Sequence, residues 1–528
     1  MTVRVVTAGT GAAVSARLAA WDDDQFAARL WQRDPTIWFD PPRDEVSNRL
    51  GWLVLPDEDR IARIREIAAI AATDSIDDIL LIGMGGSSLA PEVFASVFSA
   101  TSPPLTILDS THPDTIAAIS DSVDPARTLV IVSSKSGKTL ETLSLFRHLW
   151  ERTAGVVDDA GSRFIAITDP GSELAQLGED RGFLAVVLAP ADVGGRYSAL
   201  TEFGLVPAAL IGVDVERLVA GAREVAAACG PDVPASANPA LQLAAALGEW
   251  AVAGRDKLIL EADPSIAALP AWIEQLVAES LGKEGTGILP IAAGTASPAA
   301  DRVPLAIALG SEPSRSAPSA ALILDDRYDI GAAMFLLEMA VAGVGAILGV
   351  HPFDQPDVEL AKRLTRTAMT DGLSSLQVTE WTLDEEDTAA RLGEMLAGAK
   401  PDGYVAIQAY LAPDEASRAE LDRLAGAIAE GTGAAVTIGF GPRFLHSTGQ
   451  YHKGGTPSGV FLQVVDRPRA DIAVPETDYT FAGLIAAQSF GDQAALSDRG
   501  RPVAMVWVGD AGPSDLPRLT ATIEMVLQ

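Results

Sequence analysis

Short apolar runs recur between about residues 79 and 190, and each is bounded by Gly, Ser, Asp or Pro. Runs of this length are typical of strands buried on both faces of a parallel sheet. The runs are DILLIG, LTILDS, TLVIVSS, RFIAITD and LAVVLAP. Segments with apolar residues at helical spacing, such as LAPEVFASVF and LETLSLFRHLW, lie between them. The alternation predicts a doubly wound α/β domain.

A second series of apolar runs follows the Pro- and Ala-rich stretch CGPDVPASANPA, residues 229–240, which we interpret as an approximate domain boundary. Its candidate strands are DKLILEAD, VPLAIALG, SAALILDD, GYVAIQAYL, AAVTIGFG, VFLQVVD and VAMVWVGD. The first 55 or so residues, with Trp21, Trp31 and Trp38 at wide spacing, are expected to form a helical lead-in. The predicted division is a lead-in over 1–55, a first α/β domain over 56–230, and a second α/β domain with a C-terminal extension over 231–528.

Composition limits the classes of function. Of the 528 residues, 48% are hydrophobic and 21% are charged, which is typical of a globular chain with more than one packed unit. The 39 basic and 71 acidic residues give a formal net charge of -32. This charge repels nucleic-acid phosphates and anionic membrane surfaces, so we expect neither as a partner. A site for an anionic small molecule has to gather basic side chains and backbone N–H groups locally.

Cysteine content and the most apolar segment bear on location. The single cysteine, Cys229, allows no intramolecular disulfide and no Cys-based metal site. The first residues lack the sustained apolar stretch of a signal peptide. Residues 332–350 approach the length of a membrane span but carry Glu338, so we expect a buried core helix there. These features predict a cytoplasmic protein.

The stretch VIVSSKSGKTLET, residues 130–142, contains the SGKT that ends a nucleotide-binding P-loop, between a predicted strand and a predicted helix. A P-loop requires GxxxxGK[ST], and Val132 occupies the position of its first glycine. ATP binding is therefore disfavoured. An ordinary helix start rich in Ser and Thr stays open as an alternative.

A glycine-rich turn in DILLIGMGGSSLAPEVF has the same context of strand, turn and helix. Gly83 and Gly85 match the start of a dinucleotide-binding GxGxxG, but Ser88 occupies the third glycine position. Two such loops at the carboxyl ends of strands in one sheet suit a monophosphate better, because it needs fewer glycines. The candidate phosphate ligands are Ser87, Ser134, Ser136 and Thr139.

Six blocks of sequence carry a resemblance to a known family. IGMGGSSLAP, SSKSGKTLET, GGRYSALTEFG, ESLGKEGTG, HPFDQPDVELAK and HSTGQYHKGG are similar to signature blocks of the phosphoglucose isomerase family and span residues 82–455. The chain also resembles the isomerase part of bacterial transaldolase/glucose-6-phosphate isomerase fusions. The resemblance implies sugar isomerase (SIS) domains, no cofactor or metal, and a homodimer. The implied reaction interconverts glucose 6-phosphate and fructose 6-phosphate through a cis-enediol, in glycolysis and gluconeogenesis.

The resemblance also implies roles for individual residues. Glu279, in ESLGK, matches the base that moves a proton between neighbouring sugar carbons, and Arg196 matches the cation that stabilises the enediolate. His446 and Lys362 match the pair that opens the sugar ring. The implied substrate contacts are Gly86, Ser87, Ser134, Lys135, Ser136, Thr139, Gln355 and Gln450.

The order of two blocks departs from the family pattern. In the common form the histidine block precedes the FDQ block, whereas here His446 follows Lys362 by 84 positions. The resemblance therefore leaves open whether His446 acts in its own subunit or in a neighbour's. His351, directly before Pro352, is the alternative candidate for ring opening.

Two other functions stay open from the sequence. One is an isomerase of another sugar phosphate, such as a mannose or amino-sugar phosphate, because specificity at C2 depends on contacts that one sequence does not define. The other is a non-catalytic SIS-type sensor of sugar phosphates. A sensor has no need of Glu279, Arg196, His446 and Lys362 together, so their joint presence favours the enzyme.

Overall fold

The computed structural model describes residues 3–7, 11–72, 76–99, 103–310 and 318–528. These residues group into two units, each made of several stretches of chain. Unit 1 comprises Met1–Leu108, Val123–Leu281 and Val303–Asp354, and unit 2 comprises Asp109–Ser122, Gly282–Arg302 and Gln355–Gln528. Residues 1–2 and 8–10 of the predicted lead-in lie outside the described residues.

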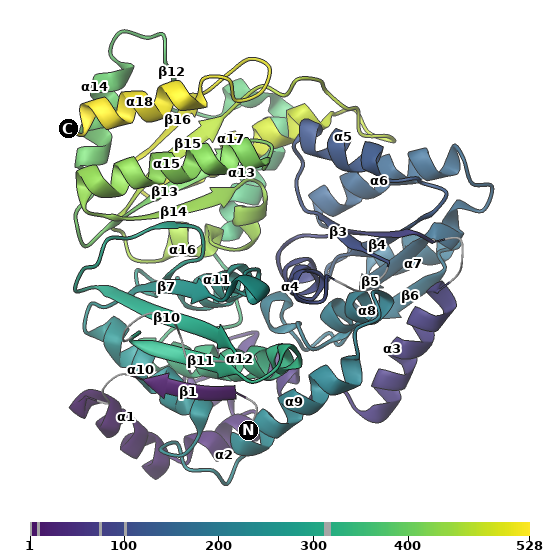
Figure 1. Ribbon diagram of the computed structural model, residues 1–528, viewed down its shortest axis with the longest axis vertical. Helices are drawn as coiled ribbons and strands as arrows, with labels where there is room; N and C mark the ends of the chain where they lie inside the picture. The colour runs from purple at the N-terminus through teal and green to yellow at the C-terminus, as the bar shows by residue number, and fades with distance from the viewer. Residues whose placement is uncertain (1–2, 8–10, 73–75, 100–102, 311–317) are drawn as a thin grey trace. The chain divides into compact units, whose positions relative to one another are not determined.

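The first sheet of unit 1 contains the five strands predicted between residues 79 and 190. They are β2 (Asp78–Ile82), β3 (Leu105–Leu108), β4 (Thr128–Ser133), β5 (Phe164–Thr168) and β6 (Ala185–Leu188), in the order β3-β2-β4-β5-β6. All neighbours pair in parallel. The interior strand β4 is buried throughout, which explains its unbroken apolar sequence. Helices α4 (Leu89–Val97), α6 (Leu140–Ala154) and α7 (Glu173–Asp180) follow β2, β4 and β5 (Figure 1).

The second sheet of unit 1 contains the predicted strands β7 (Lys257–Ala262), β10 (Arg302–Leu309) and β11 (Ala320–Leu324). β1 (Val3–Thr7) adds to its edge, antiparallel to β11 (Figure 1). This strand differs from the helical lead-in expected for residues 1–55, because residues 3–7 pair with β11. The other helices of unit 1 are α3 (Glu58–Ala71), α8 (Glu202–Leu210), α9 (Val215–Ala228), α10 (Pro239–Val252), α11 (Leu269–Leu281) and α12 (Ile330–Leu348).

The rest of the lead-in is helical, as predicted, with α1 (Ala12–Asp23), α2 (Phe26–Trp31) and three short 3-10 turns. Two of its tryptophans fasten it to the rest of unit 1, and a third packs within the lead-in. The indole N–H of Trp31 donates to the carbonyl of Cys229 at 2.7 Å, and that of Trp38 donates to Ala342 at 2.9 Å. The ring of Trp21 stacks on Phe26 with centroids 4.5 Å apart.

Helix α12 confirms the buried core helix predicted for residues 332–350. The stretch 327–348 is long and apolar enough to cross a membrane, but 89% of its most apolar window is buried inside the structure. Glu338 lies within it at 1% exposure, and burial raises the pKa of its carboxyl well above the usual value. A neutral carboxyl explains how this acidic residue fits the core.

Unit 2 is built on a sheet of order β12-β16-β15-β13-β14-β9. Its strands are β12 (Glu380–Thr382), β13 (Tyr404–Tyr410), β14 (Ala435–Phe440), β15 (Gly459–Val465), β16 (Val503–Trp507) and the short antiparallel β9 (Gly294–Thr295). Its helices are α5 (Pro113–Ser122), α13 (Val358–Asp371), α14 (Thr388–Ala397), α15 (Glu415–Thr432), α16 (Gly449–Gly454), α17 (Phe481–Asp498) and α18 (Leu516–Val526); β8 (Leu289–Ile291) also belongs to it.

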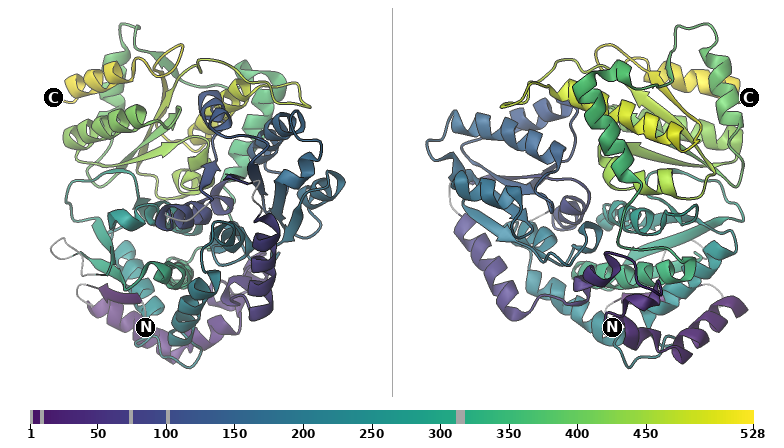
Figure 2. Two further views of the ribbon diagram at one scale, coloured as in Figure 1. Left: turned by 45° about the vertical axis from the view of Figure 1, so that its right-hand side comes forward. Right: turned by 180° about the vertical axis from the view of Figure 1, so that it is seen from behind.

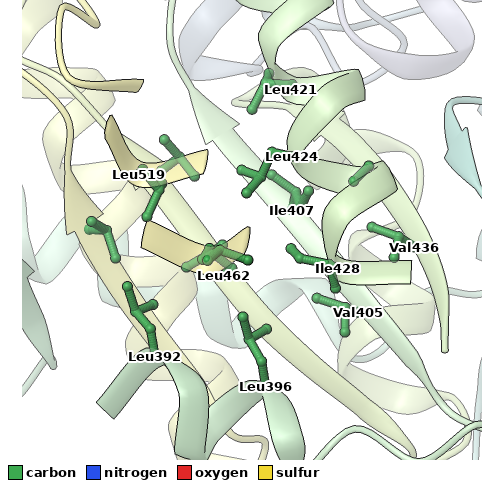
Figure 3. Packing of buried hydrophobic residues seen from close by; sticks show 14 of the residues in the cluster. Leu392, Leu396, Val405, Ile407, Leu421, Leu424, Ile428, Val436, Leu462 and Leu519 are labelled. Atoms are coloured by element: carbon green, nitrogen blue, oxygen red, sulfur yellow. The ribbon is translucent and has the colours of Figure 1, made fainter. Parts of the chain in front are cut away.

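Different helices cover the two faces of this sheet. Side chains of α14, α15 and α18 pack on one face in an apolar core that includes Leu392, Leu424, Leu462 and Leu519 (Figure 3). Helices α13 and α17 lie side by side (Figure 2, right). Polar side chains from α17 bind residues of the opposite face, as for Asp492 and Gln463.

The fold class is confirmed as mixed α/β with predominantly parallel sheets. Each predicted strand in both series is present. The second series is divided between two sheets, however, and residues 231–281 group with unit 1. The linear domains 1–55, 56–230 and 231–528 stay a prediction.

Candidate functional site

The two predicted phosphate loops of unit 1 leave the carboxyl ends of neighbouring strands. β2 and β4 pair directly, with Ile82 opposite Val132. In the order β3-β2-β4-β5-β6, β3 lies on one side of β2 and the later strands lie on the other side. The order in which strands are added therefore reverses between β2 and β4. In doubly wound sheets ligands bind in the crevice outside the carboxyl ends at such a reversal. The topology thus brings Ser87 and Ser134 to the edge where a ligand is expected.

The first loop contains the short helix η4 (Gly85–Ser87). Gly85 has φ of 57°, a conformation that favours glycine. A Cβ added to Gly86 would lie 2.1 Å from the carbonyl oxygen of Gly195. Only glycine fits at Gly86 without displacing the backbone of η6 (Gly195–Tyr197), which carries Arg196. The first loop and Arg196 are therefore held together by direct backbone packing.

The second loop runs from Ser134 to Thr139 and leads into α6. The Ser134 and Thr139 hydroxyls lie 2.9 Å apart. Gly137 has φ of 67°, and the backbone N–H of Lys138 donates to the Ser136 hydroxyl at 3.2 Å. The loop thus places three hydroxyls at the start of a helix, where free N–H groups suit an anion.

Lys135 has a partner that the sequence did not indicate. Its ammonium nitrogen lies 2.5 Å from a carboxylate oxygen of Asp169, at the end of β5, and donates to the carbonyl of Ala191 at 3.2 Å. Burial raises the pKa of Asp169, and the charge of Lys135 opposes that shift. A phosphate contact from the Lys135 side chain would have to replace or share these contacts.

Arg196 is buried, at 4% exposure, and donates in four directions. Its Nε donates to Ser280 Oγ at 2.9 Å, and Nη1 donates to Glu279 Oε2 at 3.4 Å. Its Nη2 donates to the carbonyls of Pro352 at 2.7 Å and Asp354 at 2.8 Å. Fixing a guanidinium by so many contacts orients its charge before any substrate binds.

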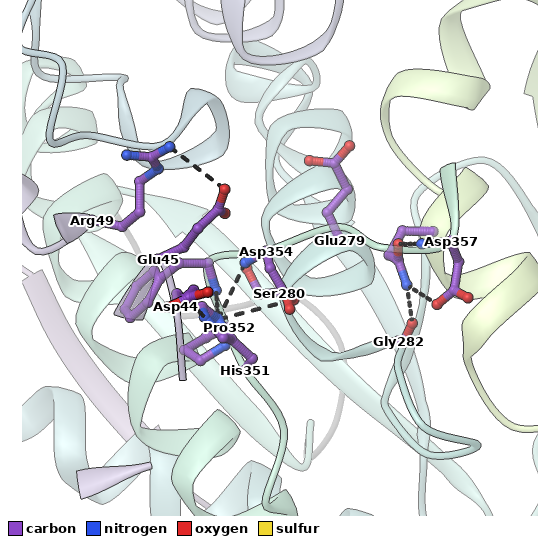
Figure 4. Close-up of polar contacts among 12 residues, drawn as sticks. Asp44, Glu45, Arg49, Glu279, Ser280, Gly282, His351, Pro352, Asp354 and Asp357 are labelled. Atoms are coloured by element: carbon purple, nitrogen blue, oxygen red, sulfur yellow. Dashed lines mark hydrogen bonds and ion pairs between the residues drawn. The ribbon is translucent and has the colours of Figure 1, made fainter. Parts of the chain in front are cut away.

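Glu279 lies on α11, two residues before the helix ends, and is 5% exposed (Figure 4). Gln275, one turn earlier, donates from Nε2 to the same Oε2 at 3.4 Å. The structure therefore brings the predicted base and the predicted cation of unit 1 into contact. Their roles stay predictions. Ser280, Gln275 and the Pro352 and Asp354 carbonyls were missed, although Ser280 stands beside Glu279 in the ESLGK block.

His351, the alternative candidate for ring opening, uses both ring nitrogens within unit 1 (Figure 4). Its Nδ1 accepts the backbone N–H groups of Phe353 at 3.1 Å and Asp354 at 3.2 Å. Its Nε2 therefore carries the proton, which it donates to the carbonyl of Asp44 at 2.8 Å. This imidazole shapes the turn whose carbonyls hold Arg196, and the geometry gives little support to a role in ring opening.

The remaining predicted site residues belong to unit 2. Gln450 is fully buried, and its side-chain amide is hydrogen-bonded within the protein. Its Nε2 donates to the Gly282 carbonyl at 2.9 Å and to Asp357 at 2.6 Å. Lys362 lies on α13, and its ammonium donates to Glu359 at 2.8 Å. His446 ends the short helix η10 (Arg443–His446) and is partly exposed, and Gln355 is exposed. The described residues contain no group of three or more His, Cys, Asp or Glu that could hold a metal ion.

Comparisons with known proteins agree with the blocks found in the sequence. Residues 63–288 match the family Phosphoglucose isomerase. A glucose-6-phosphate isomerase from Rubrobacter xylanophilus is 29% identical over 416 residues, 66% of this chain and 93% of the relative. One from Cyanothece sp. is 34% identical over 278 residues, half of each chain. For several of the matched relatives, the similarity to this chain covers only about half of the relative's length.

Solved structures show the same fold. The hypothetical protein TT0462 from Thermus thermophilus is similar over 70% of this chain and 100% of its own, with a TM-score of 0.59 and 24% identity. A glucose-6-phosphate isomerase from Chlamydia trachomatis is similar over 74% of this chain and 91% of its own, with a TM-score of 0.55 and 18% identity. The matched domain contains both Arg196 and Glu279. Residues 63–288 are thus similar to the phosphoglucose isomerase family, and the chain as a whole is similar to glucose-6-phosphate isomerases.

Proposed function

We propose that this protein is an aldose–ketose isomerase that interconverts glucose 6-phosphate and fructose 6-phosphate through a cis-enediol, in glycolysis and gluconeogenesis. The observation that carries the proposal is the contact of Arg196 with Glu279, 3.4 Å apart and both buried, inside the phosphoglucose isomerase domain. The reaction needs a base and a cation at neighbouring sugar atoms.

Glu279 is the proposed base. It takes a proton from the carbon beside the carbonyl and returns it to the neighbouring carbon, so one carboxylate serves both directions. Arg196 compensates the negative charge that develops on the enediolate oxygen. Because its guanidinium is already fixed by Ser280 and two carbonyls, it needs no reorganisation during the reaction.

The two loops at the carboxyl ends of β2 and β4 are the proposed phosphate site. Ser87, Ser134, Ser136 and Thr139 supply hydroxyls, and Gly86 lets the first loop approach η6 closely. The backbone of Lys135 is available for a contact even while its side chain binds Asp169. Binding of the phosphoryl group at these loops would supply binding energy from a part of the substrate that does not react.

In unit 2, His446 and Lys362 are the proposed ring-opening residues, with Gln355 and Gln450 as further contacts. An imidazole can move a proton between the ring oxygen and the anomeric hydroxyl near neutral pH. The buried Gln450 is expected to act through the turn that it fastens to Gly282 and Asp357, since both bonds occupy its donor nitrogen. We also propose a cytoplasmic homodimer, on the family resemblance and the lone buried Cys229.

The decisive experiment follows fructose 6-phosphate formation from glucose 6-phosphate by the wild type and by Glu279→Gln. Loss of the base should lower kcat by about 10²- to 10⁴-fold, while KM changes little. Glu274→Gln is the matched control, because Glu274 is a second buried carboxylate on α11. Absence of turnover in the wild type, or full turnover in Glu279→Gln, would refute the proposal.

A further inference from the structure

One face of the unit 2 sheet buries a cluster of charged and amide side chains. The ammonium of Lys453, on α16, lies 2.5 Å from a carboxylate oxygen of Asp492, on α17, and both side chains are at most 1% exposed. The other carboxylate oxygen accepts from Gln463 Nε2 at 3.1 Å, and the same Nε2 donates to Gln408 Oε1 at 3.1 Å. A charged pair and two amides are therefore buried together.

This cluster is costly for the fold. Among the described residues, Gln408 Nε2, Gln463 Oε1 and the Tyr410 hydroxyl are buried without a hydrogen-bond partner. Buried polar atoms in native proteins are almost always paired, and apolar replacements of buried ion pairs are often neutral or stabilising. The other face of the same strands is entirely apolar. Stability alone thus gives no reason for placing Lys453 and Asp492 here.

The pair fastens a segment that the proposed function uses. Lys453 belongs to the six-residue helix α16, which also carries Gln450 and begins three residues after His446. Arg501 donates from Nη2 to the carbonyls of Lys453 at 3.2 Å and Gly455 at 2.7 Å, which fixes the end of α16. So short a helix has little stability of its own and depends on such contacts.

We propose that Asp492 and Lys453 are positioning residues for the isomerase, and that their buried ion pair fixes α16 and thereby the placement of His446 and Gln450. The inference rests on the proposed function. It assigns these two residues to ring opening, because His446 is the group proposed for that step, and it leaves proton transfer by Glu279 to unit 1. Neither residue is proposed to contact substrate. Both act through the segment 446–454.

The test separates ring opening from isomerisation. Exchange between the α and β anomers of glucose 6-phosphate, followed by NMR, reports ring opening alone, and formation of fructose 6-phosphate reports the whole reaction. Asp492→Asn should slow anomer exchange and lower kcat, each by about 10- to 100-fold, with little change in KM. Glu279→Gln, in contrast, should keep anomer exchange while losing isomerisation.

A second variant removes the charge pair without leaving one charge unpaired. Lys453→Met combined with Asp492→Leu should fold at least as well as the wild type, judged by its unfolding midpoint, and should still lose anomer exchange. This variant decides the question if Asp492→Asn does not fold. Asp387→Asn is the matched control, because Asp387 and Arg391 form an exposed pair in the same unit and should not affect either rate.

The outcomes are distinguishable. A wild type that does not isomerise glucose 6-phosphate refutes the proposed function itself. If the wild type is active and the double variant retains both anomer exchange and kcat, the pair is only structural and the inference is wrong. Loss of anomer exchange in a folded double variant, with the Asp387→Asn control unchanged, supports the positioning role.

Discussion

The two faces of the β13–β15 pair in unit 2 are equally buried but chemically different. On one face Val405, Ile407 and Leu462 join the apolar core beneath α15 and α18 (Figure 3). On the other face Gln408 and Gln463 bond to each other and onward to α17. Successive residues of a strand point to opposite faces, so Gln408 and Gln463 lie on the face opposite Ile407 and Leu462.

This contrast separates the requirements of folding from those of function. Burial of apolar area stabilises a fold in proportion to the area removed from water. Buried amides and charges give no comparable gain, because their hydrogen bonds replace bonds to water. The apolar face therefore contributes stability, and the amides and charges of the other face add defined contacts for α16 and α17 to the apolar packing of Val465 and Met505 against α17. Variants on neighbouring residues of one strand can test this division directly.

The largest effect on stability is expected from Leu462→Ala on the apolar face. Leu462 is fully buried, and removing its side chain leaves a cavity among closely packed residues. We expect a loss of about 3 kcal/mol in the free energy of unfolding, measured by urea denaturation. The kcat of the folded fraction should be unchanged. A large fall in kcat at unchanged stability would contradict the assignment of this face to stability.

A smaller effect on stability is expected from Gln463→Leu, one position along the strand. The substitution removes the donor to Asp492 and Gln408, each at 3.1 Å, but replaces an amide by an apolar side chain of similar size. We expect the free energy of unfolding to fall by no more than about 2 kcal/mol. The kcat should nevertheless fall several-fold, since Asp492 loses a fixed neighbour. A variant with wild-type kcat would show that the amide cluster has no positioning effect.

Much of the fold could be predicted because buried parallel strands have nearly continuous apolar sequences. β4, in TLVIVS, and the strands of the second series follow this rule. The strand β1 could not, because its five residues become a strand only by pairing with Ala320–Leu324, about 300 positions away. Periodicity within a short segment holds no information about such a partner.

Site residues could be predicted where the type of side chain determines the chemistry. Contacts made by backbone groups could not be predicted from the sequence. Ser134 and Thr139 were expected together, and their hydroxyls lie 2.9 Å apart. Two of the groups that hold Arg196 are carbonyls, of Pro352 and Asp354, and any residue supplies a carbonyl. The pairing of Lys135 with Asp169 likewise depends on two loops meeting in space. The family resemblance assigned roles, but only the structure identified these partners.

The smallest effect concerns the charge state of His452, on α16. Burial, together with the charges of Lys453 and Arg501, lowers the pKa of this imidazole to about 3, and the Tyr404 hydroxyl lies 3.2 Å from its Nδ1. In the unfolded chain the pKa is about 6.5, so between these values only the unfolded state binds the proton. Stability should therefore fall as pH decreases below about 6.5, by about 1.4 kcal/mol per pH unit from this residue.

The comparison of the wild type with His452→Gln isolates that contribution. Urea denaturation at pH 6 and pH 5 should show the wild type losing about 1.2 kcal/mol more than the variant over this unit, because the unfolded imidazole is already partly protonated at pH 6. Between pH 7.5 and 8.5 the two proteins should show the same dependence, because the imidazole is neutral in both states. Equal slopes at acidic pH would mean that His452 takes up a proton inside the fold. The fold would then accommodate a further positive charge beside Lys453, and the geometry of the Lys453–Asp492 pair would depend on pH instead of being fixed.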